Sequence, residues 1–138
     1  MNLSDGSAEV AYDSEPGRVF EISMTGDGSV WAATETGLLH RRTDTPAEDF
    51  ELVTLPGVDK NERMASLAIT NDGALYVGTA REGLFRIDRE GEITRRHVEC
   101  FSGEWVYSLA EIRPGVLWLG TYGQGLIEIS ESGDHACR

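Results

Sequence analysis

The stretch "VLWLGTYGQGLIEIS", residues 116–130, reads as two short strands joined by a glycine-rich turn. Two earlier stretches have the same design: "VWAATETGLLHRRT" (30–43) and "LYVGTAREGLFRID" (75–88). Strands of four to eight apolar and aromatic residues separated by glycine are typical of antiparallel sheets. The stretch is therefore one copy of a repeated unit.

The full repeat covers residues 19–43, 64–88 and 106–130. Gly28 and Gly73 are 45 residues apart, and Gly73 and Gly115 are 42 residues apart. A period in the low forties, with four strands in each unit, is typical of a β-propeller blade. We therefore predict an all-β chain of three four-stranded antiparallel blades.

Within each copy the strands follow one order. The first strand begins at residue 19, 64 or 106, and the two middle strands flank the glycine-rich turn. In the first two copies an Asp-Gly pair separates the first two strands and predicts a two-residue hairpin, and Pro-Gly takes its place in the third. The fourth strand is expected at 50–55 and 93–99.

Composition fits one domain and excludes some partners. The chain has 138 residues, of which 40% are hydrophobic, and it carries 12 basic against 24 acidic residues, a net charge of −12. Such a charge repels nucleic acid and anionic membranes, so neither is an expected partner. The start of the sequence has no secretory signal pattern. We expect a cytoplasmic protein if Met1 is the native start, and an extracytoplasmic one if the chain is part of a larger sensor.

The repeats resemble those of the two-component regulator propellers. "DGALYVGTAREGLFRID" and "PGVLWLGTYGQGLIEIS" follow that family's pattern, roughly Asp-x-x-Gly-x-Leu-Trp-x-Gly-Thr-x-x-Gly-Gly-Leu. Copy one departs from it, with Ala33 in place of the glycine before threonine. The resemblance covers about residues 19–131 and implies a bacterial sensor module, which in that family lies outside the cytoplasm and is often followed by a kinase.

Three blades are too few to close a ring, because propellers typically have four to eight. We expect a flexible N-terminus at 1–7, a strand at 8–14, blades at 18–55, 63–99 and 105–131, and a tail at 132–138. The third blade is expected to lack its fourth strand. The strand at 8–14 would supply it to a partner chain, so that two chains close a six-bladed ring, with a nine-bladed trimer or a fragment of a larger propeller as alternatives.

Propellers often bind ligands where the segments before the first strands meet the turns between the second and third strands. The positions before the first strands are Arg18, Arg63 and Trp105, and the turns contribute Arg81, Tyr122 and Gln124, together with Glu35 and Glu82. Arginines and aromatics suit a carboxylate, a sugar or a peptide. The alternative is that these residues are solvated or paired with acidic neighbours.

The other repeated residues predict structure and not chemistry. An aromatic residue repeated once per blade, here Trp31, Tyr76 and Trp118, indicates packing between blades. The histidines at 40, 97 and 135 show no metal-ligand spacing, and Cys100 and Cys137 are far apart. We predict no catalytic residue, no metal and no cofactor.

Three functions remain open from the sequence. The preferred one is a non-enzymatic binding or sensory module for a small molecule, glycan or peptide. The second is an assembly scaffold or a fragment of a larger propeller, whose chief property is self-association. The third is an enzyme that resembles the streptogramin lyases, which are propellers with a catalytic histidine.

Overall fold

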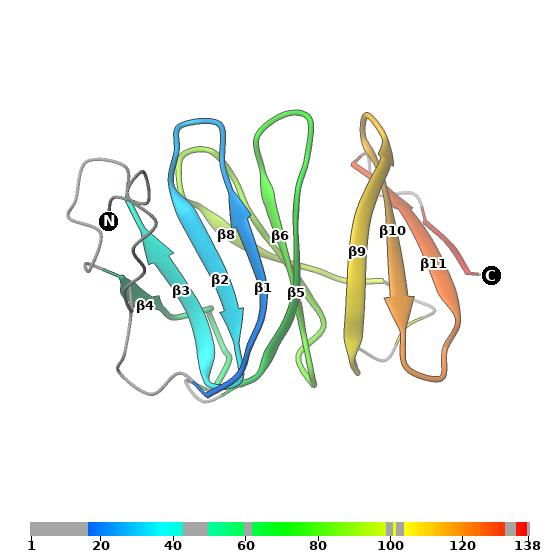
Figure 1. Ribbon diagram of the computed structural model, residues 1–138. Helices are drawn as coiled ribbons and strands as arrows, with labels where there is room; N and C mark the ends of the chain where they lie inside the picture. The colour runs from blue at the N-terminus through cyan, green and yellow to red at the C-terminus, as the bar shows by residue number, and fades with distance from the viewer. Residues whose placement is uncertain are drawn as a thin grey trace, which may run out of the picture.

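A computed structural model describes residues 17–42, 50–59, 62–98, 101 and 104–131, and the backbone of 135–137. These residues form three four-stranded antiparallel sheets that stand side by side (Figure 1). Among them there is no helix, and hence none that could cross a membrane. The prediction of an all-β chain with three antiparallel sheets is confirmed.

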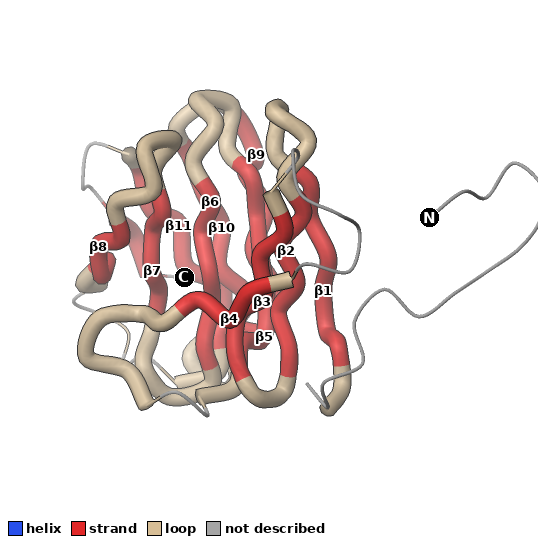
Figure 2. The backbone as a smooth tube through the Cα atoms, turned by 90° about the vertical axis from the view of Figure 1, so that its left-hand side faces the viewer, coloured by secondary structure: helices blue, strands red, loops and turns tan. Residues whose placement is uncertain are grey.

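The first sheet holds β1 (Val19–Met24), β2 (Val30–Thr34), β3 (Gly37–Arg41) and β4 (Glu51–Val53). The second holds β5 (Met64–Ile69), β6 (Leu75–Thr79), β7 (Leu84–Ile87) and β8 (Ile93–Arg96), and the third β9 (Val106–Arg113), β10 (Val116–Thr121), β11 (Leu126–Ser130) and β12 (His135–Cys137). In each sheet the spatial order follows the chain order. Figure 2 looks onto the first sheet, with the other two stacked behind it.

The third sheet corrects the prediction that its fourth strand is missing. Residues 135–137 pair with β11 as β12, with Ile129 opposite His135 and Ile127 opposite Cys137. A three-residue edge strand needs only one row of backbone hydrogen bonds, so its sequence carries too little alternation to be recognised. The edge of β11 that faces away from β10 is therefore already paired within the chain. The predicted strand at 8–14 lies outside the described residues.

The first hairpins also differ from the two-residue type predicted. In the first sheet Thr25 and Ser29 close the turn, and the N–H of Gly28 bonds to the carbonyl of Thr25. Only the glycine has a positive φ, +88° at Gly28, while Asp27 does not. This is a type I turn followed by a left-handed glycine. The aspartate serves the turn through its carboxylate, which accepts the Ser29 N–H at 3.0 Å.

The sheets pack face to face through two apolar layers. The first layer contains Trp31 and Leu38 from the first sheet with Leu67 and Phe85 from the second. The second layer begins with Tyr76, which is 1% exposed. Its remaining members are Ala68, Leu84, Val98, Phe101, Val106, Leu117, Leu119, Ile127 and Ile129. Each fully buried large side chain contributes about 1.5–3 kcal/mol, so these layers hold the three sheets together.

Polar contacts fix the spacing between neighbouring sheets. Glu21 accepts the N–H of Leu67 at 2.8 Å, and the Ser66 hydroxyl donates to the Val106 carbonyl at 2.7 Å. A Cβ on Gly78 would lie 2.6 Å from the Val106 side chain, so only glycine permits this approach. The first strands of the three sheets therefore lie close together along one side of the molecule, which brings their starting residues to one end.

Candidate functional site

The segments before the first strands meet the turns after the second strands at one end of the molecule. The same backbone hydrogen bond occurs in each sheet: Glu35 N–H to Arg18, Ala80 N–H to Arg63, and Tyr122 N–H to Trp105, at 2.8, 3.0 and 3.2 Å. These bonds hold both segments at one level. We call this end the rim, and define it by a set of seven residues. They are Arg18, Phe20, Glu35, Arg63, Trp105, Tyr107 and Tyr122.

Arg63 occupies the middle of the rim between two aromatic rings. Its guanidinium carbon lies 5.6 Å from the Phe20 ring centroid and 5.4 Å from the Trp105 ring centroid. Its Nη2 donates to Glu35 Oε1 at 3.0 Å. Arg18 flanks the same elements, 6.0 Å from Phe20 and 3.7 Å from the Glu35 carboxylate. Stacking and pairing together hold the central guanidinium in place.

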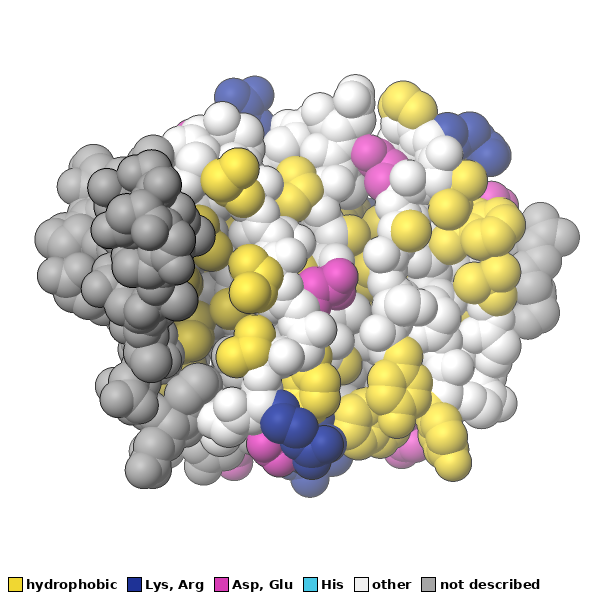
Figure 3. All heavy atoms as spheres, in the orientation of Figure 1, with side chains coloured by type: hydrophobic (Ala, Val, Ile, Leu, Met, Phe, Trp, Pro, Cys, Tyr) yellow, Lys and Arg dark blue, Asp and Glu magenta, His cyan; other side chains and the backbone are white. Residues whose placement is uncertain are grey.

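Two tyrosines extend this row on the side of the third sheet. The rings of Trp105 and Tyr107 stack at 5.1 Å, and the Tyr122 ring meets that of Tyr107 edge-on at 6.0 Å. Tyr107 is 52% exposed and Tyr122 is 69% exposed. In Figure 3 basic, acidic and hydrophobic side chains gather at the lower end of the view, below the first strands. The rim therefore presents aromatic surface to solvent beside a fixed cation.

A β-bulge directs the aromatic side chains at this end. The pairing register shifts between Val19 and Glu21 in β1, and β9 shifts in the same way near Val106. The residues at the shifts are Phe20 and Tyr107. Bulges commonly re-aim a side chain next to a site. The equivalent residue of β5 is Ala65, which places no ring between the two aromatic residues.

Trp105 adopts a backbone conformation that is rare for its residue type. Its φ is +51°, the one positive φ among the described non-glycine residues. For a bulky side chain this conformation costs on the order of 1–2 kcal/mol and commonly occurs at functional sites. The Trp105 N–H bonds to the Ala80 carbonyl at 2.7 Å, which helps to hold the strained residue. In this conformation the indole ring lies beside the Arg63 guanidinium.

Glu35 stays ionised at the rim. The backbone N–H of Arg18, 3.1 Å from its Oε2, is the main cause that holds the pKa of this carboxyl below its usual value. Burial opposes this effect and is second in size, and the charges of Arg18 and Arg63 also lower the pKa of the Glu35 carboxyl. The carboxylate neutralises part of the charge of Arg63, while the side chain of Arg18 remains 73% exposed.

The structure brings together five of the predicted candidate residues: Arg18, Glu35, Arg63, Trp105 and Tyr122. Arg81, at the same end, pairs with the buried carboxylate of Glu62 at 3.7 Å. Gln124 lies in the turn before β11, where its N–H bonds to the Thr121 hydroxyl.

Sequence reasoning missed Phe20 and Tyr107. A signal existed, because both residues are aromatic at the same repeat position.

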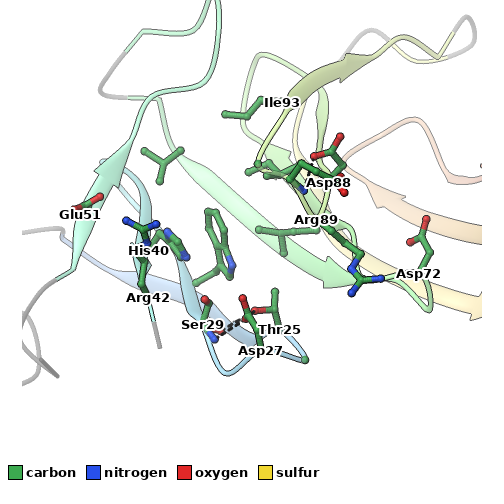
Figure 4. Close-up of a pocket in the computed structure, with 18 of the residues that line it drawn as sticks. Thr25, Asp27, Ser29, His40, Arg42, Glu51, Asp72, Asp88, Arg89 and Ile93 are labelled. Atoms are coloured by element: carbon green, nitrogen blue, oxygen red, sulfur yellow. Dashed lines mark hydrogen bonds between the residues drawn. The ribbon is translucent and has the colours of Figure 1, made fainter. Parts of the chain in front are cut away.

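A groove of about 1000 Å³ lies between the first two sheets at the opposite end of the strands (Figure 4). His40 stacks on Trp31 there with ring centroids 3.9 Å apart, and burial lowers its pKa. The carboxylates of this groove serve its own turns: Asp88 accepts two backbone N–H groups, and Asp72 pairs with Arg86 at 3.1 Å. The groove is therefore a weaker candidate than the rim.

Across the described part of the chain, no three His, Cys, Asp or Glu side chains are grouped so as to hold a metal ion. The side chain of residue 135 and all of residue 100 lie outside it. The rim instead offers aromatic faces, guanidinium groups and one carboxylate. This chemistry suits binding of an organic ligand by stacking and by charged hydrogen bonds.

No protein-family model matches this chain, and no curated protein sequence matches it. Solved structures match its fold. The extracellular domain of a proposed one-component system from Bacteroides thetaiotaomicron is 24% identical over 86% of this chain, with a TM-score of 0.71. That of a proposed hybrid two-component system from the same organism is 16% identical over 86% of the chain, with a TM-score of 0.66. Virginiamycin B lyase from Staphylococcus aureus is 18% identical over 89%, with a TM-score of 0.69.

The chain spans less than half of the length of each of these proteins: 16%, 17% and 41%. At these identities the likeness shows the fold, a propeller-like row of three blades. The predicted relation to two-component sensors is thus supported at the level of structure.

Proposed function

We propose that this chain is a non-enzymatic binding module of the sensor-propeller type and that the rim is its binding site. One observation carries the proposal. Arg63 is held between Phe20 and Trp105, and the Trp105 ring contacts the first of two exposed tyrosines. A row of rings and cations is therefore arranged before any ligand binds. Ordering the site in advance lowers the entropic cost of binding.

The chemistry of the rim favours a short ligand that has both a ring and a carboxylate. The exposed faces of Tyr107 and Tyr122 offer stacking surface. Arg18 offers a guanidinium that is mostly exposed, and a guanidinium binds a carboxylate through two parallel hydrogen bonds. The net charge of −12 disfavours long polyanions. A short acidic sugar, built of uronic-acid units, meets these conditions.

The similar structures support this proposal through their fold and their cellular location. Two of the similar structures are extracellular domains of signalling systems. Their location supports the extracytoplasmic alternative for this chain, in which the rim would meet ligands outside the cytoplasm.

The test is a calorimetric titration of the full chain with digalacturonic acid, with lactose as the neutral probe. We expect Arg18→Ala to weaken binding of the acidic sugar about tenfold, since hydrogen bonds to charged groups contribute about 1.5–3 kcal/mol. Tyr107→Ala should also weaken it, by up to about tenfold, because it removes stacking surface. Arg89→Ala is the matched control, because Arg89 is an exposed arginine of the groove at the opposite end. Equal losses in Arg18→Ala and Arg89→Ala would contradict a site at the rim.

The non-enzymatic part of the proposal has its own test. The likeness to virginiamycin B lyase suggests quinupristin as the probe, since it is bound in one of the similar lyase structures. We expect no conversion of quinupristin by the wild-type chain over hours at micromolar protein. Conversion that is lost in His40→Ala or His97→Ala would overturn the proposal and favour the lyase-like alternative.

A further inference from the structure

Neighbouring sheets pack face to face at two interfaces inside the molecule. The outer face of the third sheet resembles one side of such an interface, and the outer face of the first sheet resembles the other side. Where the second sheet meets the third, the Ser66 hydroxyl of the second sheet donates to the Val106 carbonyl of the third, and Gly78 leaves room for the Val106 side chain. Tyr76 packs in the same layer. This contact does not depend on the proposed ligand site.

The third sheet carries the donor half of this interface on its outer face. Ser108, Trp118 and Gly120 occupy the repeat positions of Ser66, Tyr76 and Gly78. Gly120 again lies against the serine, since a Cβ there would be 2.4 Å from the Ser108 hydroxyl. The surroundings differ, because Ser108 is exposed and Trp118 is half-buried, whereas Ser66 and Tyr76 are buried.

The first sheet carries the receiving half. Val19 is 49% exposed, whereas Val106 at the same repeat position is 0% exposed. Ile22 is 67% exposed, and its equivalent Leu67 is 2% exposed. Met24 continues this apolar row, and Figure 3 shows hydrophobic side chains along β1. These exposed apolar side chains of the first sheet are of the same kind as those that face the second sheet from the third, so they could cover the outer face of the third sheet.

We propose that the third sheet of one chain packs against the first sheet of a second copy of this chain, head to tail. By repeat equivalence, the Ser108 hydroxyl would donate to the carbonyl of the second copy's Val19, as Ser66 does to Val106. Two chains joined in this way at both ends form a six-bladed ring. The contact runs through sheet faces and needs no exchanged strand, since β12 already pairs with β11.

The size of the two faces agrees with this arrangement. Four strands of about five residues give a face of about 300 Å². The four faces of two contacts total about 1,200 Å², at the lower limit of a stable interface.

The experiment is light scattering of the full 15.1 kDa chain at several concentrations, with two variants. The expected wild-type mass is twice that of the chain. Ile22→Asp on the first sheet and Ser108→Arg on the third sheet are each expected to yield the single-chain mass. Both residues are exposed, so the sheets themselves should stay folded, which circular dichroism checks. Thr94→Asp, an exposed position on β8, is the matched control and should keep the double mass.

Each other outcome overturns the proposal. A wild-type chain of single mass would mean that the two faces do not meet. A dimer that is lost in only one of the two variants would mean that like faces pack together. A triple mass would overturn the two-chain ring.

Discussion

The layers between the sheets and the rim are built from the same sequence repeat, but they differ in which part of the repeat is kept from copy to copy. At the packing position each copy keeps the same kind of residue: Trp31 and Tyr76 lie in the layers between the sheets, and Trp118 at the same position of the third sheet is also a large aromatic. At the rim, each copy keeps only the backbone. One hydrogen bond recurs three times, while the residue before the first strand changes from arginine to tryptophan.

This difference separates two kinds of constraint. A buried position must fill the same volume in every copy, because interiors are close-packed and tolerate little change. A position at the rim must only keep the backbone hydrogen bond of its loop, so its side chain can differ between copies. The large side chain repeated at the packing position therefore goes with packing between sheets, whereas the residue before the first strand varies between copies and belongs to the proposed binding site.

The strongest test of the comparison removes one large ring from each region. Tyr76→Ala should lower the free energy of unfolding by about 4 kcal/mol, since it empties a fully buried site between two sheets. Tyr107→Ala should cost about 1 kcal/mol or less, because Tyr107 is 52% exposed. Urea unfolding followed by circular dichroism measures both. Equal losses would mean that the rim is part of the core.

A second test adds one methyl group instead of removing a ring. In Gly78→Ala the new Cβ would lie 2.3 Å from the Ser66 hydroxyl and 2.6 Å from Val106, so the second and third sheets must separate. We expect a loss of about 2 kcal/mol in urea unfolding. Gly26→Ala is the control, because nothing lies within 4 Å of its Cβ position and no positive φ is required. A tolerated Gly78→Ala would show that the contact between the sheets is loose.

A third test concerns the strain at the rim. At φ +51° an alanine is strained and a glycine is not, and both remove the indole of Trp105. Trp105→Gly should therefore be about 1 kcal/mol more stable than Trp105→Ala in the same urea experiment. At Arg63, whose φ is not positive, the order should reverse, with Arg63→Ala more stable than Arg63→Gly. If alanine were the more stable residue at both positions, the strain at Trp105 would be absent.

These regions also differ in how far the sequence predicts them. The spacing of Gly28, Gly73 and Gly115 predicts the three sheets, and the apolar alternation predicts most strands, because both are local patterns that backbone geometry imposes. The convergence of Arg18, Arg63 and Trp105 follows from the repeat as well. All these signals are periodic in the sequence.

The missed features depend on contacts that are distant in the chain. The bulges that place Phe20 and Tyr107 arise from the pairing register of two strands, and register is fixed only when the strands meet. β12 is held by backbone pairing with β11, which needs no particular side chain pattern. Trp105, which has a positive φ, donates its N–H to the carbonyl of Ala80, which follows β6 of the preceding sheet. The bulges, β12 and this φ have no local sequence signal, although the aromatic character of Phe20 and Tyr107 repeats between copies.

The smallest expected effect is the pH dependence of the turns at the groove end. The hydroxyl of Thr70 is the main cause that lowers the pKa of Asp72 below 3.8, helped by the Ala74 N–H and by Arg86 and opposed by burial. A carboxyl whose pKa is lower in the folded chain stabilises the fold at pH values above its unfolded pKa. That stabilisation is lost as the pH falls through the lower, folded value.

Asp72→Asn should therefore be less stable than the wild type at neutral pH, and the difference should shrink as the pH falls below about 3.8. Thermal unfolding at a series of pH values measures this difference. Asp27→Asn should give a curve of the same sign, because the hydroxyl of Thr25 lowers the pKa of Asp27 in the equivalent turn. A difference that stays constant down to pH 2 would mean that the carboxylate charge does not stabilise the turn. The groove's acidic residues would then be open to a role in binding, and the preference for the rim would weaken.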